Sequence, residues 1–288
     1  MKTGISRKKI NAARLSIFSN SFLILTKLFV GIITGSVSII SEAIHSVMDL
    51  LAAIVAFFSV RISDNPPDKE HPYGHAKVEN VSGVIEALLI FIAAGWIIYE
   101  AILKIKDDNP VESLGLGFAV MMISALLNVL VSRRLYKVAK ETGSLALEAD
   151  ALHLKTDVYT SLGVALGMAL IWITGLHFLD PIIAMLVALL ILKEAIVLLK
   201  KAFSPLLDAS IAKEDIEIIE KYLYSEKYKF HNLRTRKAGN QKFIDFHLEL
   251  PEDTSVKDAH AICDIIEQDI KNQIPYTEIT IHVECLEN

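Results

Sequence analysis

Apolar residues dominate the first 207 positions of the chain, where short polar breaks divide them into six long stretches. A helix needs about 20 mainly apolar residues to cross the hydrocarbon layer of a membrane. The stretches reach that length, and two of their cores, 115–132 and 158–179, contain no charged residue. The pattern predicts six transmembrane helices, at 13–34, 37–62, 80–103, 114–137, 145–174 and 178–200.

After residue 207 the pattern changes to short amphipathic segments. They predict a helix, a strand, a hairpin, a strand, a helix and a strand, at 212–224, 228–237, 239–240, 241–250, 256–273 and 278–286. In the second and third strands apolar and polar residues alternate. This period of two places His247, His282 and Glu284 on the face away from the helices. We expect a transmembrane domain over 1–207 and a small α+β domain over 208–288.

Composition and charge support this division. Hydrophobic residues make up 52% of the chain and the mean hydropathy is +0.43, too apolar for one ordinary soluble domain. From residue 208 onward, 17 acidic residues face 10 basic ones, so the second domain is acidic. Cys263 and Cys285 are the two cysteines, which excludes a four-cysteine zinc site and suits a reducing cytoplasmic side. Both fall on apolar faces and are predicted to be core residues.

Basic residues in short loops stay cytoplasmic, and here they gather on one side of the predicted spans. The other side has Lys104 and Lys106. An even number of spans then puts both termini and the acidic domain in the cytoplasm of a multi-pass protein of the inner cell membrane. The basic residues on the cytoplasmic side are Lys2, Arg7, Lys8, Lys9, Arg14, Arg61, Lys69, Lys77, Arg133, Arg134, Lys137, Lys140, Lys200 and Lys201.

Two predicted spans carry the same polar motif, H-x-x-x-D, as His45 with Asp49 and His153 with Asp157. A spacing of four places each histidine and its aspartate on one helix face. Two such helices can offer two nitrogens and two oxygens to one ion, a good tetrahedral zinc site. An ionised side chain near the bilayer centre costs about 2.5–3.5 kcal/mol, and a bound dication would offset that cost.

A local hydrogen bond that lines a polar groove would also explain either pair alone. The motif recurs at His260 and Asp264 in a predicted soluble helix, so by itself it is weak. Its strength here comes from the duplication at membrane depth.

With these two motifs, six spans and a small α+β tail, the chain resembles a cation diffusion facilitator over nearly its whole length. The resemblance implies a homodimeric divalent-metal exporter that exchanges the ion for protons, with a ferredoxin-like, metallochaperone-like cytoplasmic domain. It assigns the transport site to His45, Asp49, His153 and Asp157. The best-known bacterial members have Asp in place of His45. The histidine resembles the pattern of animal zinc transporters that disfavour cadmium, which implies Zn²⁺ ahead of Fe²⁺, Mn²⁺, Co²⁺ or Cd²⁺.

The same resemblance implies two further metal sites. Asp68, His71 and His75, in the loop after the second span, match an interfacial zinc site of the family, although an ordinary solvated loop would read the same way. In the tail, related exporters hold a binuclear zinc site that joins two protomers. The candidate ligands there are His231, His247, His260, His282 and Glu284, where Glu284 replaces an Asp of the family. A solvated polar face is the alternative. Lys77 and Asp208 match a charge pair between membrane part and tail, although each could be a plain surface charge.

Other classes of protein fit less well. The sequence has neither the phosphate-binding G-x-x-x-x-G-K-[ST] of an ATP-driven pump nor the H-E-x-x-H of a metalloprotease, so no enzyme is expected. A metal-gated channel or a non-transporting metal-sensing scaffold would use the same ligands. The expected partners are divalent metal ions, protons, the lipid bilayer and a second copy of the chain, and no nucleic acid is expected.

Overall fold

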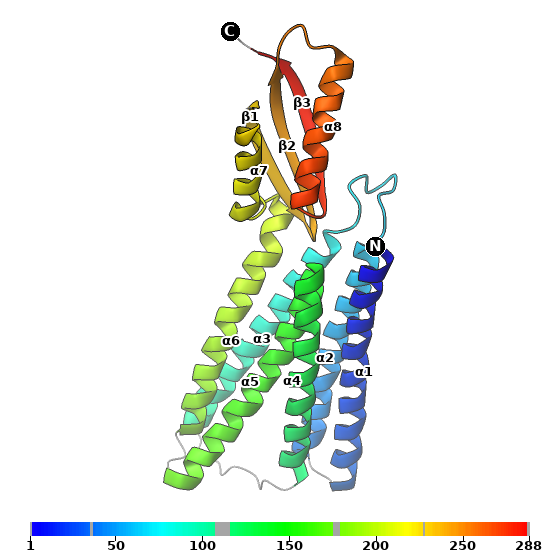
Figure 1. Ribbon diagram of the computed structural model, residues 1–288. Helices are drawn as coiled ribbons and strands as arrows, with labels where there is room; N and C mark the ends of the chain where they lie inside the picture. Colours follow the sequence, from blue (N-terminus) through cyan, green and yellow to red (C-terminus); the bar gives the residue numbers. More distant parts are fainter. Residues whose placement is uncertain (1, 35–36, 107–115, 175–178, 227, 287–288) are drawn as a thin grey trace. The chain divides into compact units, whose positions relative to one another are not determined.

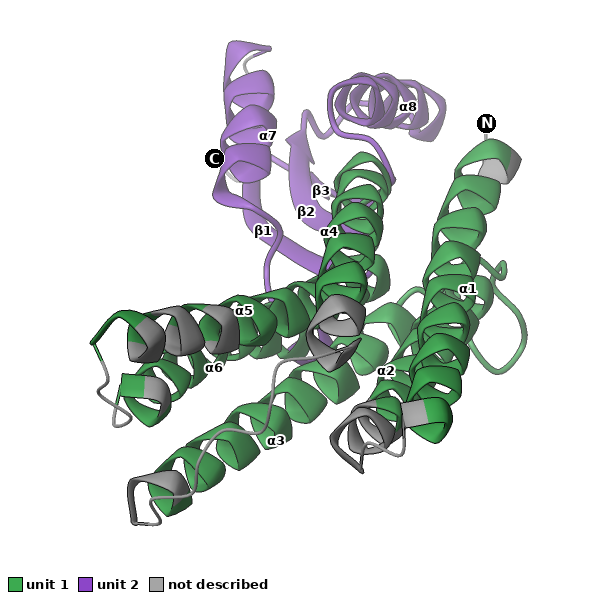
Figure 2. Ribbon diagram, turned by 90° about the horizontal axis from the view of Figure 1, so that it is seen from below, with its two compact units in different colours: residues 1–203 green, residues 204–288 purple. Residues whose placement is uncertain are grey.

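The computed structural model describes residues 2–34, 37–106, 116–174, 179–226 and 228–286, and at some helical positions among them, including His45, the backbone alone. The chain divides into two compact units, Met1–Phe203 and Ser204–Asn288, coloured green and purple in Figure 2.

Six long helices form the first unit (Figure 1). Their positions agree with the six apolar stretches. The largest differences are at the start of α1 and the end of α4, where the helix continues through basic residues that hydropathy does not count as part of a span. The bounds are α1 Lys2–Thr34, α2 Val37–Ser63, α3 Val78–Lys106, α4 Leu116–Thr142, α5 Leu145–Thr174 and α6 Leu179–Phe203.

Four segments of the described chain are long and apolar enough to cross a membrane: Gly4–Ile33, Ser46–Ser63, Val78–Leu103 and Pro181–Leu207. The described parts of α4 and α5 do not meet that test. At several positions of both helices the structure describes the backbone alone. The structure therefore gives six long helices and four candidate spans by length and composition.

The helices of this unit pack most extensively as the pairs α1 with α2, α3 with α6, and α4 with α5. Small residues allow close approach. A Cβ added at Gly83 of α3 would lie 3.0 Å from Cβ of Ala202, and one at Gly163 of α5 would lie 2.8 Å from Cγ2 of Val187 in α6. Such contacts are typical of helices that associate in lipid. On α1 the large apolar side chains Phe18, Leu25, Phe29 and Ile32 are exposed, as expected for a face toward acyl chains.

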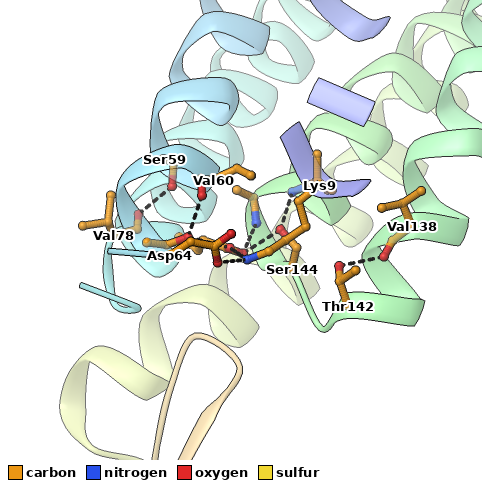
Figure 3. Close-up of polar contacts among 12 residues, drawn as sticks. Lys9, Ser59, Val60, Asp64, Val78, Val138, Thr142 and Ser144 are labelled. Atoms are coloured by element: carbon orange, nitrogen blue, oxygen red, sulfur yellow. Dashed lines mark hydrogen bonds and ion pairs between the residues drawn. The ribbon is translucent and has the colours of Figure 1, made fainter. Parts of the chain in front are cut away.

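A buried ion network ties four helix ends together at one end of this unit (Figure 3). Lys9 of α1 is 1% exposed and donates to Asp64 Oδ1 at 2.6 Å and to Glu79 Oε1 at 2.9 Å. Glu79 also accepts from the hydroxyl of Ser63, at 2.9 Å, and from that of Ser144, at 2.7 Å. One carboxylate thus joins the start of α1, the end of α2, the start of α3 and the turn before α5.

The second unit contains the 3₁₀ turn η1 Ser204–Leu207, α7 Lys213–Ser225, β1 Lys229–Ala238, β2 Gln241–Leu250, α8 Val256–Gln273 and β3 Thr277–Cys285. The sheet order is β1-β2-β3, with β1 antiparallel and β3 parallel to β2. Alternate residues of β2, Ile244, Phe246 and Leu248, are buried against α7 and α8. The α+β class is confirmed. The order is that of the ferredoxin-like motif without its first strand.

Candidate metal centres

Asp49 of α2 and His153 and Asp157 of α5 lie together inside the helical unit. Nε2 of His153 is 3.2 Å from Oδ1 of Asp49, and the ligand atoms of the three residues lie within 4.8 Å of one another. Asp49 and His153 are 6% and 7% exposed. One imidazole and two carboxylates converge here because α2 and α5 pack together and place Asp49, His153 and Asp157 on the shared face.

Polar side chains of two further helices hold this cluster. Asn128 Nδ2 of α4 donates to Asp157 Oδ2 at 3.5 Å, and Asn20 Nδ2 of α1 donates to the carbonyl of Asp49 at 3.3 Å. Asn128 thus contacts a ligand side chain directly, and neighbours of this kind tune a metal site, whereas Asn20 bonds the backbone of Asp49. The sequence left Asn128 without a role and did not single out Asn20. An amide at membrane depth was the signal that could have found both.

The predicted fourth ligand, His45, belongs to α2 one turn before Asp49, and its side chain lies outside the described residues. Its part in the site stays a prediction. Nδ1 of His153 is buried and has no hydrogen-bond partner among the described residues. The other ring nitrogen, Nε2, contacts Asp49 Oδ1, and it is the nitrogen that would bind an ion shared with that carboxylate.

Asp68, His71 and His75 form a second group, in the loop between α2 and α3. Nε2 of His75 is 3.3 Å from Asp68 Oδ2, Nδ1 of His71 is 3.5 Å from Asp68 Oδ1, and the rings are 4.5 Å apart. Gly74, at φ +81°, donates its N–H to the carbonyl of His71 at 2.9 Å and so closes the turn between the two histidines. A positive φ is the conformation that glycine adopts without strain.

The carboxylate of Asp68 in this loop has a lowered pKa, which favours its charged form. The backbone N–H of His71 donates to Oδ1 of Asp68 at 2.6 Å and is the main cause that lowers the pKa of Asp68. The N–H of Glu70 and the neighbouring imidazoles lower it further. Asp68 and His71 are exposed and His75 is half-buried, so the group is open to solvent. Two nitrogens and one carboxylate suit zinc with a water in the fourth position.

The tail sheet brings a third group together on the face opposite the helices. His231 of β1 lies opposite His247 of β2, which in turn lies opposite His282 of β3. Neighbouring rings are 5.0 and 4.9 Å apart. Glu284 reaches all three histidines: the distances from its carboxylate oxygens to His247 Nδ1, His231 Nε2 and His282 Nε2 are 2.8, 3.3 and 3.5 Å.

Glu249 belongs to this group although the sequence did not select it. Its Oε1 is 3.2 Å from Nδ1 of His231. The period-two pattern of β2 places it on the same face as His247, which is the signal that could have identified it. With Glu284, it gives the row of imidazoles a carboxylate from each of two strands.

His260 is not brought to this cluster within the described chain. It lies on α8, its side chain is 78% exposed, and its Nε2 is 3.6 Å from Asp264 Oδ2.

The prediction that both cysteines are core residues is confirmed for one of them. Cys263 packs against the apolar core, but Cys285 is exposed, because β3 is an edge strand and its apolar cover ends before Val283, which is 39% exposed.

The predicted charge pair joins residues of different units, so Lys77 and Asp208 stay a prediction as a pair. Within the second unit, Asp208 has φ +54° and its Oδ1 lies 3.5 Å from Nη1 of Arg236 in β1. Asp208 therefore stands at a sharp bend directly after η1.

Comparison with known proteins adds two family matches and full-length relatives. Residues 13–207 match the cation efflux transmembrane domain, and residues 211–285 match the cytoplasmic domain of cation efflux proteins. An uncharacterised transporter of Synechocystis, sll1263, is 39% identical over 89% of this chain and 84% of its own length. The cation-efflux pump FieF of Klebsiella pneumoniae is 30% identical over 96% and 92%, and Protein p34 of Rickettsia rickettsii is 28% identical over 94% and 90%.

Proposed function

The chain belongs to the cation efflux family of membrane transporters, and from this premise we propose that it exports Zn²⁺ in exchange for protons. The cation efflux of its relatives sets the class, and the chain is a transporter rather than an enzyme. The finer assignment of zinc and of protons rests on the chemistry of the buried site.

The observation that carries the proposal is the cluster of Asp49, His153 and Asp157, buried between α2 and α5. A mixed set of imidazole nitrogen and carboxylate oxygen suits Zn²⁺ in four-fold coordination, and His45 would complete two nitrogens and two oxygens. Fe²⁺, Mn²⁺, Co²⁺ and Cd²⁺ accept similar donors, so they are the competing substrates.

Proton exchange follows from the contact between His153 and Asp49. Imidazole binds metal only when its ligating nitrogen carries no proton. At 3.2 Å from Asp49 Oδ1, Nε2 of His153 can hold either a proton shared with that carboxylate or a metal ion, but not both. Protons and metal therefore compete for one position, which is the requirement for antiport.

For the arrangement in the membrane, we propose that all six helices α1–α6 cross the inner membrane and that both termini are cytoplasmic. The family match covers the six helices as one transmembrane domain, and basic residues cluster at the ends joined by the α2–α3 loop. The loop ligands Asp68, His71 and His75 would then meet cytoplasmic metal.

The tail is proposed as the regulatory and dimerising part, in line with the cytoplasmic dimer domain that it matches. Its group of His231, His247, His282 and Glu284 with Glu249 would bind Zn²⁺, and His260 would join it from a second copy. Bound cations would offset the repulsion of two acidic tails. Such a site shifts an equilibrium between arrangements and tunes the transport rate, with Lys77 and Asp208 as the proposed hinge.

Purified protein in liposomes tests transport and coupling together. With an outwardly directed proton gradient, the wild-type protein should accumulate Zn²⁺ against its own gradient, which neither a metal-gated channel nor a non-transporting scaffold does. Asp157→Asn and His153→Ala should lose most of this flux. Asp264→Asn is the matched control, because it alters an H-x-x-x-D motif on the exposed face of α8. Downhill flux that ignores the proton gradient would indicate a channel.

A further inference from the structure

Two carboxyl groups deep in the helical unit take no part in the three metal centres. Glu86 of α3 and Asp150 of α5 are both 0% exposed. The hydroxyl of Ser16 in α1 donates to Oδ1 of Asp150 at 3.2 Å. Oδ2 of Asp150 and both carboxylate oxygens of Glu86 have no hydrogen-bond partner among the described residues. Buried polar groups are nearly always hydrogen-bonded, so this pair calls for an explanation.

The pair lies beside the transport cluster, on the side of the ion network. Along α5, Asp150, His153 and Asp157 are spaced by three and four residues and share one face. The helical rise places Asp150 about 5 Å before His153. On α3, Glu86 follows Glu79 by two turns, about 10 Å. Along α3 and α5, carboxyl groups thus follow one another between the network end of the unit and the level of the transport cluster.

The titratable groups that act on Glu86 and Asp150 offer little positive charge. The titratable groups that act on Glu86 are His153, Asp150 and Asp49, and those that act on Asp150 include His153 and Asp49. Among these only His153 can be positive. Glu79, in contrast, has Lys9. Neither Glu86 nor Asp150 has a described hydrogen bond or ion pair with a transport ligand.

We propose that Glu86 and Asp150 together hold one exchangeable proton, which leaves when a metal ion enters the site of Asp49, His153 and Asp157. This inference rests on the proposed exchange of metal for protons and names the residues that couple the two. Two carboxyl groups in a dry interior cannot both be ionised without large cost, and one proton on either of them removes much of it. Zn²⁺ is a poorer occupant, because two carboxyls and one hydroxyl offer it no nitrogen.

The coupling is electrostatic. A dication in the transport cluster, about 5–10 Å along α5 from Asp150, repels a proton on the pair through a medium of low dielectric constant. The proton leaves a carboxyl oxygen as H⁺, and the negative charge that remains stabilises the metal ion. Coupling between two sites is reciprocal, so returning the proton weakens metal binding by the same factor.

Proton release on zinc binding tests this assignment. Full-length protein in detergent is titrated with Zn²⁺ by calorimetry, in two buffers of different protonation enthalpy, to count the protons released. The double variant Glu86→Gln with Asp150→Asn should release about one proton fewer per zinc ion bound. Its zinc affinity should also depend less on pH, with a slope of log affinity against pH that is lower than the wild-type slope by about one. The loop and tail sites are unchanged, so the difference reports on the pair.

Glu148→Gln is the matched control, since Glu148 lies two residues before Asp150 but pairs with Lys201 at 2.7 Å, and it should release the wild-type number. If the double variant does not fold, each single variant leaves a lone carboxyl, and its proton should leave in a pH range displaced by about one unit or more. Wild-type release by the double variant, or unchanged pH ranges in both singles, would overturn the role of the pair alone. A wild-type protein that releases no proton would overturn the exchange itself and this role with it.

Discussion

At the scale of single residues, the buried ion pairs of Lys9 should contribute strongly to the stability of the helical unit. Its ammonium group is buried between Asp64 and Glu79, so Lys9→Met leaves Glu79 buried without a cation. Removing one partner of a buried ion pair costs roughly 3–5 kcal/mol. We expect a large fall in the thermal stability of the detergent-solubilised protein. The same change at Lys8, whose pair with Glu141 is exposed and 3.5 Å long, should cost at most about 1 kcal/mol.

The double variant Lys9→Met with Glu79→Gln should be more stable than Lys9→Met alone, because it no longer leaves a bare charge inside. Equal melting temperatures for Lys9→Met and Lys8→Met would contradict the importance of the network.

A tyrosine of the tail links stability to pH. Burial raises the pKa of Tyr222, and the hydrogen bond to Asp269 at 2.8 Å raises it further. The folded tail therefore favours the protonated phenol. This contribution is fully present below the unfolded value of about 10 and is lost as the pH rises above it. Denaturant unfolding of the wild-type protein between pH 8 and 11 should show declining stability, and Tyr222→Phe should reduce the slope. An identical slope in both proteins would contradict the argument.

At the scale of elements, the contact of α5 with α6 depends on Gly163. A methyl group there would lie 2.8 Å from Cγ2 of Val187, so Gly163→Ala forces the helices apart at a cost of about 1–3 kcal/mol. Adding Val187→Ala should restore much of the loss, measured as thermal stability in detergent. Gly95→Ala in α3, where nothing lies within 4 Å, should be neutral or slightly stabilising. Additive losses in the double variant would exclude the clash as the cause.

The elements were largely predictable from the sequence, because helices and strands leave their period in the apolar pattern. The predicted β2 and α8 agree with Gln241–Leu250 and Val256–Gln273, and the resemblance to the cation efflux proteins is confirmed. Hydropathy could not show that α1 begins at Lys2, because that end is held by ionic contacts across the chain. The same limit hid Asn20 and Glu249, whose roles depend on which strands and helices become neighbours.

At the scale of the whole molecule, the tail has an apolar core of its own, built from β2, α7 and α8. Residues 204–288 expressed alone should therefore fold as a soluble domain, detectable by circular dichroism. Sedimentation should show association that increases with Zn²⁺. His247→Ala with His282→Ala should lower that zinc response, and Lys271→Ala, in an exposed pair with Glu267, should leave it unchanged. Folded tails that ignore zinc would refute their role as a sensor.

The ion network also has a consequence for biosynthesis. Lys9 is made first, and its partners Asp64 and Glu79 follow 55 and 70 residues later. Ser144, the last hydrogen-bond donor to Glu79, follows another 65 residues after Glu79. While the chain emerges from the ribosome, the charge of Lys9 must stay in water until Asp64 and the start of α3 have been made. This end of the helical unit closes only after the turn before α5 has been synthesised, so a nascent chain stalled in α4 would carry an open, hydrated end that quality-control proteases could recognise.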